Sequence, residues 1–227
     1  MDTPLVDDVT LLLLNPETGR PLTDATRLRA VLPGAVLLDL ALRERLESEP
    51  SRWGGDKVRV RDASPTGDEV LDEALRRLGD RPTAARTAVQ RLGGLKLGRA
   101  VRDRMVARGL VRHEPGGFLR FARDHPEPGA RKALVSEVAS ALGDGADVTP
   151  HAAALVSLLQ SVGAVPKVVP GLGLSRRQLT DRVQQIADGM AEGEWAGEAV
   201  SAAVRAAQAA VTTAIVTSTV VATSGTN

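Results

Sequence analysis

Residues 32–46, with the sequence LPGAVLLDLALRERL, decide the fold class of this chain. Val36, Leu37 and Leu40 recur at the spacing of helical turns, so they fall on or near one face of a helix. Residues 43–45 are charged and are expected to face water. The pattern predicts a strong amphipathic helix that begins after the proline and runs through Leu46.

The segments before this stretch are also apolar and punctuated by turn residues. Thr23 or Asp24 can cap a short helix, which is expected to end before Pro33 because proline disfavours the helical conformation in the residue before it. Residues 5–14 predict either a helix or a buried strand, and the turn at 15–19 ends it.

Beyond residue 46 the helical pattern continues. Residues 58–61 alternate Val with Arg and predict a short strand. Thr66 with Glu69 three positions later fits a capping box, so a helix is expected to begin there. Further helices are predicted near 82–92, 95–108, 127–142, 150–162 and 175–191, with a last one from about Trp195.

One segment has the pattern of a β-hairpin. Residues 110–113 and 118–121 flank a Pro-Gly-Gly sequence at 115–117, which favours a turn between two strands. We therefore predict a mainly α fold with a projecting β-hairpin. The expected organisation is a single helical domain over 1–222 and a disordered tail over 223–227.

Composition excludes several classes of function. The chain has 227 residues, of which 43% are hydrophobic and 25% charged, as in a soluble globular protein. With no cysteine there is no disulfide or thiolate site, and three histidines argue against a histidine-rich metal centre. Aromatic residues make up 2%, too few for base-stacking platforms. Enzyme motifs are absent as well, so neither catalysis nor a metal or other cofactor is expected.

We expect a cytoplasmic location. Residues 9–14 are too short for a signal peptide and follow acidic residues. The uncharged stretch 206–227 contains many Thr and Ser and falls short of a membrane span, so it predicts a terminal core helix with a frayed end.

Charge is sorted along the chain. The window 86–132 holds twelve Lys and Arg against four Asp and Glu, which suggests an anionic partner. Arg99 and Arg102 are three positions apart on the predicted helix and lie on one side, where two guanidinium groups can grip a phosphate. The alternative is that both arginines pair with acidic side chains elsewhere on the fold.

A second interpretation of this window is a winged helix. An arginine-rich helix followed by a hairpin would then place its arginines on the phosphates of duplex DNA. Against this interpretation, the helix lacks the Asn and Gln that read bases. A third possibility is a structural module that assembles through its hairpin.

Several separate blocks, in order along the chain, resemble the Golgi phosphoprotein 3 family. The resemblance extends from about residue 5 to 190. Arginine greatly outnumbers lysine in the chain, which is typical of a GC-rich genome and indicates a bacterial member. The blocks are Leu11–Leu14 with Gly19, Leu32–Leu46, Ala63–Leu75, Arg99–Arg104, Gly109–Val111 and Phe118–Pro126.

The resemblance implies a peripheral membrane protein that binds phosphatidylinositol 4-phosphate, or anionic phospholipid more generally, in a basic pocket. The Arg/Lys-x-x-Arg pair of the family falls on Arg99 and Arg102, and Lys96 and Arg104 are expected to assist. An early tryptophan and arginine of the family pocket are replaced by Asp24 and Pro33. Arg20, Arg27 and Arg29 are the candidates to substitute for them.

The resemblance also implies that the hairpin mediates self-association. Its residues here are Val111, Phe118, Leu119 and Phe121, and a homo-oligomer is expected. By strand alternation Phe118 and Phe121 fall on opposite sides, so at least one ring needs a partner beyond its own face. No nucleic-acid partner is implied by the family.

Overall fold

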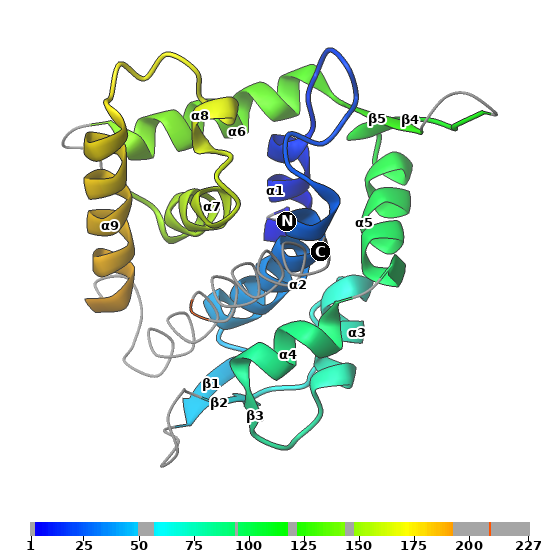
Figure 1. The fold of residues 1–227 in the computed structure, drawn as a ribbon. Helices are drawn as coiled ribbons and strands as arrows, with labels where there is room; N and C mark the ends of the chain where they lie inside the picture. The colour runs from blue at the N-terminus through cyan, green and yellow to red at the C-terminus, as the bar shows by residue number, and fades with distance from the viewer. Residues whose placement is uncertain are drawn as a thin grey trace, which may run out of the picture.

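A computed structural model describes residues 3–49, 57–93, 95–117, 122–143, 148–192 and 209. Helices dominate these residues, and two small antiparallel sheets lie at the edges of the molecule (Figure 1). A mainly α fold with a β-hairpin is therefore confirmed.

The elements in chain order are α1 (Leu5–Leu13), α2 (Ala25–Leu42), β1 (Leu46–Glu49), β2 (Lys57–Val60), α3 (Glu69–Leu78), β3 (Thr83–Ala84), α4 (Ala85–Leu92), α5 (Leu95–Ala107), β4 (Val111–Glu114), β5 (Arg123–Pro126), α6 (Pro128–Leu142), α7 (Pro150–Ser161), α8 (Val165–Val168) and α9 (Arg176–Glu192).

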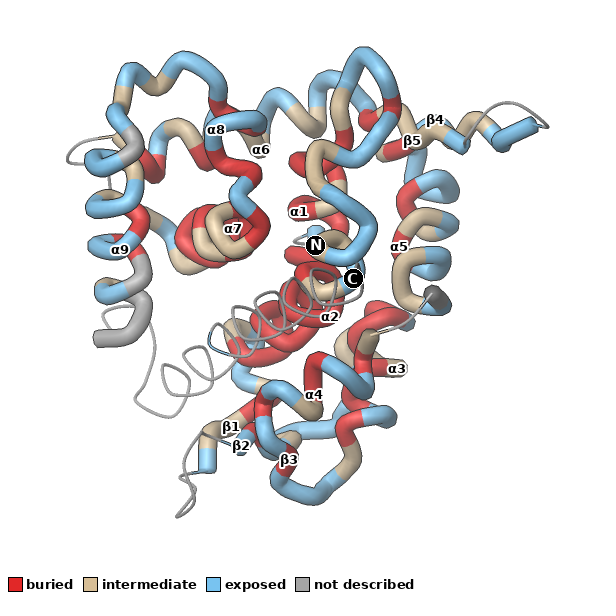
Figure 2. Tube along the Cα trace, in the orientation of Figure 1, coloured by how far each residue is buried: buried red, intermediate tan, exposed pale blue. Residues whose placement is uncertain are grey.

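Helices α1, α2 and α7 form the centre of the core (Figure 2). The first segment, for which the sequence allowed a helix or a strand, is a helix in which every leucine and valine is buried. Asp7 and Asp8 are buried as well, so the helix is covered on nearly every side. Its first turn is anchored by Asp39 of α2, whose Oδ2 accepts a hydrogen bond from the Leu5 amide at 2.8 Å.

Helix α2 passes through Pro33 without ending, so the predicted helix break before this residue is wrong. An internal proline removes one backbone hydrogen bond and costs about 3 kcal/mol in a helix. Val31, Leu32, Ala35 and Val36 around it are all buried. Burying each large side chain contributes about 1.5–3 kcal/mol, so packing outweighs the proline.

The two ends of α2 are defined by local hydrogen bonds. Asp24 caps the first turn as predicted, accepting from the Arg27 amide at 2.9 Å. At the other end the helix does not run through Leu46, which pairs with Val60 in the three-stranded sheet β1-β2-β3. The reversal occurs at Glu44, where φ is 59° and the helix must end. The strand predicted at 58–61 is confirmed as β2.

The cap of α3 is Asp68 and not Thr66. The Asp68 carboxylate accepts from the amides of Val70 and Leu71 at 2.9 and 3.1 Å, because it stands immediately before the helix. The Thr66 hydroxyl lies two residues further out and donates to Asp72 at 2.7 Å. Thr66 therefore orders the turn before the helix, while Asp68 satisfies the first helical amides.

The hairpin projects from the end of α5 (Figure 1). Its first strand is β4, as predicted, and the partner strand is β5, with Val111 opposite Pro126 and Glu114 opposite Arg123. The second strand was expected at 118–121, which lies outside the described residues. The Asp124 amide donates to the carbonyl of Gly19 at 2.9 Å, which ties the hairpin to the turn after α1.

Helices α6, α7 and α9 complete the fold and confirm three of the predicted helices. Helices α7 and α9 begin at capping side chains: Thr149 accepts from the Ala152 amide at 3.1 Å and Ser175 from the Gln178 amide at 3.3 Å. The connection between α7 and α9 contains the short helix α8. The helix expected from about Trp195 and the tail at 223–227 lie outside the described residues.

Candidate functional site

Helix α5 carries the predicted basic residues on a rigid support. Val101 and Met105 are buried in the core, whereas Arg99 is exposed and Arg102 is half-buried on another side of the helix. This separation follows the helical spacing of the four residues. The arginine pair therefore stands at the edge of the core with its backbone fixed.

A cavity of about 360 Å³ opens between α5, the first half of α2 and the end of α1. Arg29 of α2 lines it together with Arg99 and Arg102, and we call it the arginine cavity. Among the residues that the structure describes, Asp124 of β5 is the one acidic side chain that lines it. Its apolar wall is formed by Leu13, Leu14, Leu28, Leu32, Leu97, Val101, Met105 and Val111.

The arginines of this cavity are weakly neutralised. Arg102 approaches Asp103, its exposed neighbour on the same helix, at 3.2 Å. Neither Arg29 nor Arg99 forms an ion pair with any acidic side chain in the part of the chain that the structure describes. Because Arg29 and Arg99 have no such partner and Arg102 is paired with an exposed aspartate, the cavity favours an anion with several oxygen acceptors, above all a phosphate.

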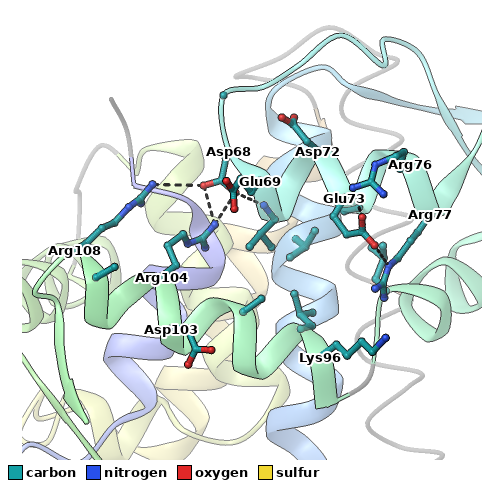
Figure 3. Close-up of a pocket in the computed structure, with 18 residues that line it drawn as sticks. Asp68, Glu69, Asp72, Glu73, Arg76, Arg77, Lys96, Asp103, Arg104 and Arg108 are labelled. Carbon is teal, nitrogen blue, oxygen red and sulfur yellow. Dashed lines mark hydrogen bonds and ion pairs between the residues drawn. The ribbon is translucent and has the colours of Figure 1, made fainter.

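Arg104 lies in a different environment, between α5 and the start of α3 (Figure 3). Its guanidinium donates to both oxygens of Asp68, at 2.6 and 2.8 Å, and to Asp7 of α1. The Arg104 side chain is 13% exposed and that of Asp7 is 0% exposed. Arg108 stands at 3.4 Å from Asp7 and reinforces the cluster. Burial raises the pKa of Asp7, and the hydrogen bond from Arg104 opposes this rise.

This geometry separates Arg104 from the predicted headgroup ligands. Both terminal nitrogens of its guanidinium donate to carboxylates, and its role in this structure is to join three helices. Lys96 is separated as well, since it lines a second cavity of about 970 Å³ between α3 and α5, with Arg76 and Arg77 (Figure 3). Helix α5 thus divides the four predicted cations between two cavities.

Comparison with known families places these features in context. The sequence model of the family described as Golgi phosphoprotein 3 (GPP34) matches residues 5–207. The chain belongs to the Golgi phosphoprotein 3 family. Among the curated proteins compared with it, none matches.

Two positions of the Golgi phosphoprotein 3 pocket were predicted to differ here, and the structure locates both. Pro33 lines the arginine cavity, and Arg29 lies one helical turn before it on the same helix. Asp24 does not line the cavity and instead caps α2 and pairs with Arg27 at 3.4 Å. Of the candidate substitutes Arg20, Arg27 and Arg29, only Arg29 lines the cavity.

The hairpin residues that the Golgi phosphoprotein 3 resemblance assigned to self-association divide into two groups. Val111 is 4% exposed and packs at the base of the hairpin against the core, so it offers no surface to a second copy. Phe118, Leu119 and Phe121 lie outside the described residues. Val111 is thus a core residue, and self-association through the hairpin stays a prediction.

Sequence reasoning missed Asp124 and Thr10, which line the arginine cavity from β5 and α1. Neither has a sequence signal, because each comes from an element far along the chain from α5. Within the described ranges no helix is both long and apolar enough to cross a membrane. The same residues contain no cluster of His, Cys, Asp or Glu side chains that could hold a metal ion.

Proposed function

We propose that this protein is a peripheral membrane protein that binds anionic phospholipid headgroups in the arginine cavity and catalyses no reaction. The observation that carries the proposal is the convergence of Arg29, Arg99 and Arg102 on one cavity, to which the described part of the chain contributes one carboxylate. Its volume is in the range of small-molecule sites. Membership of the Golgi phosphoprotein 3 family supports the same function.

The finer form of the proposal is recognition of phosphatidylinositol 4-phosphate. Pro33 cannot bind a phosphate, but Arg29 precedes it by one turn of α2, and side chains four residues apart lie on the same helix face. Arg29 thus replaces the arginine that the family pocket has at the proline position. This replacement supports retention of a three-arginine phosphate site.

The test is co-sedimentation with vesicles that are neutral, generally anionic, or doped with phosphatidylinositol 4-phosphate, at two salt concentrations. The double variant Arg99→Ala/Arg102→Ala should bind anionic vesicles about 30-fold more weakly, since each basic residue near such a surface contributes about 1 kcal/mol. The matched control is Arg81→Ala/Arg86→Ala, which removes the same charge from exposed positions outside the cavity.

Four outcomes discriminate between the possibilities. Binding to doped vesicles alone supports the finer form, whereas binding to every anionic vesicle that fades with salt supports only the general form. Equal losses of vesicle binding in the two double variants would contradict the assignment of the site to the arginine cavity and would indicate binding by a diffuse basic surface. Binding to no vesicle, with retardation of duplex DNA, would favour the winged-helix interpretation instead.

A further inference from the structure

Two oxygen acceptors line the arginine cavity together with its cations, and neither was among the predicted site residues. Asp124 lines the cavity from the hairpin and Thr10 lines it from α1. The Thr10 hydroxyl donates its proton to the carbonyl of Val6 at 2.6 Å. What Thr10 offers to a ligand is therefore its oxygen lone pairs, as an acceptor.

Asp124 is held in place from both its backbone and its side chain. Its amide donates to the Gly19 carbonyl at 2.9 Å, and its Oδ1 lies 2.5 Å from Nδ1 of His113. Its side chain is still 28% exposed. No hydrogen bond is formed by its other oxygen, Oδ2, to any described residue, so this oxygen can accept one from a ligand.

The carboxylate and the arginines line one cavity without neutralising each other. No ion pair joins Asp124 to Arg29, Arg99 or Arg102, although all four residues are described. A bare phosphate would gain from the arginines but would meet repulsion from Asp124. A headgroup that also carries a donor would satisfy the arginines with its phosphate and Asp124 with its N–H or O–H.

We infer that the arginine cavity selects phospholipids whose headgroup carries a hydrogen-bond donor beyond the phosphate, and that Asp124 imposes this selection. The inference rests on the proposed function. The donor has two sources, a hydroxyl group on a polyol or an ammonium group. Both give a charge-assisted hydrogen bond to a carboxylate, which is stronger than a neutral one.

The experiment compares phosphatidylglycerol with phosphatidylmethanol at equal mole fraction in phosphatidylcholine vesicles. The two lipids carry the same phosphodiester charge, and only the first has headgroup hydroxyls. A third vesicle keeps phosphatidylmethanol and replaces phosphatidylcholine with phosphatidylethanolamine, which supplies ammonium donors. The parent protein should bind one or both donor-bearing vesicles about tenfold more tightly than phosphatidylmethanol alone.

Two variants assign the preference to Asp124. Asp124→Ala should bind phosphatidylmethanol vesicles more tightly than the parent does. The ratio of its affinity for donor-bearing vesicles to its affinity for phosphatidylmethanol vesicles should be close to one. Asp124→Asn keeps one carbonyl acceptor and the shape of the side chain, and should give an intermediate ratio even if the alanine variant fails to fold. The matched control is Glu114→Ala, which removes a negative charge from β4 outside the cavity and should leave the ratio unchanged.

The outcomes separate this inference from the proposed function. A parent protein that binds no anionic vesicle overturns both. Binding to all three vesicles with equal affinity overturns the selection by donors and leaves the anionic site intact. A preference that Asp124→Asn does not reduce, or that Glu114→Ala reduces as much, assigns the selection to another group.

Discussion

Arg104→Met is the variant that most directly separates a structural arginine from a ligand-binding one. Methionine preserves much of the side-chain length but removes every hydrogen bond to Asp68 and Asp7. Asp7 is then left as a fully buried carboxylate. Breaking a buried ion pair by removal of one partner costs about 3–5 kcal/mol. Because Arg108 remains at 3.4 Å from Asp7, we expect the lower end, about 3 kcal/mol.

The size of this loss should depend on pH. Burial already raises the pKa of Asp7, and removal of Arg104 takes away the hydrogen bond that opposes the rise. An acid whose pKa is raised in the folded state favours folding most when it is protonated, at low pH. The free energy of unfolding of Arg104→Met should therefore approach that of the parent as pH falls from 7 to 5.

The assays are urea denaturation and thermal unfolding, each followed by circular dichroism at pH 7 and at pH 5. A loss of about 3 kcal/mol corresponds to a fall in Tm of roughly 6–12 °C for a chain of this size. Arg99→Met is the matched control, and because Arg99 is exposed the loss should stay within about 0.5 kcal/mol. If Arg104→Met were as stable as this control at pH 7 but lost vesicle binding, the assignment of Arg104 to the core would be refuted.

Two further predictions concern the packing around α1. The two ring nitrogens of His151 lie 3.0 and 2.9 Å from carboxylate oxygens of Asp8 and Glu137, and chiefly the hydrogen bond that the ring donates to Asp8 raises the pKa of His151 to about 9. This stabilisation is complete below the ordinary pKa of about 6.5 and is lost as pH rises through about 9. Because the His151 side chain is 36% exposed, we expect the free energy of unfolding of the parent to fall by about 1–2 kcal/mol between pH 6.5 and 9. The His151→Gln variant should show no such fall, and urea denaturation measures both. Gly19→Ala should lower stability by about 1–2 kcal/mol, because φ there is +63° and a Cβ would lie 2.8 Å from Nε2 of His125; a Tm equal to the parent's would contradict this.

Local patterns predicted most of the elements. The helices near 95–108, 127–142, 150–162 and 175–191 were expected at nearly their observed bounds, because each has apolar side chains at helical spacing and a recognisable start. The same spacing placed Arg99 and Arg102 on one side of α5. These features depend on residues within a few positions of each other, which the sequence displays directly.

One prediction that failed depends on contacts between distant segments, and another on the local choice between two capping residues. Pro33 was expected to end a helix, but burial of the residues around it keeps α2 continuous. Thr66 was expected to cap α3, but Asp68 stands immediately before the helix and accepts from its first amides. An internal proline costs about 3 kcal/mol, and the long-range packing around Pro33 exceeds this cost.

By itself, the sequence determined the helical class, the hairpin, the basic character of 86–132 and the family to which the chain is similar. Only the tertiary structure decided which cations share a site. Arg104 lies five positions from Arg99 on the same helix, yet buried Asp7 and Asp68 hold it in the core. Arg29 and Asp124 come from distant segments and join the arginine cavity. The reason is physical: spacing along one helix sets the direction of a side chain, whereas the partner it meets there comes from another part of the chain.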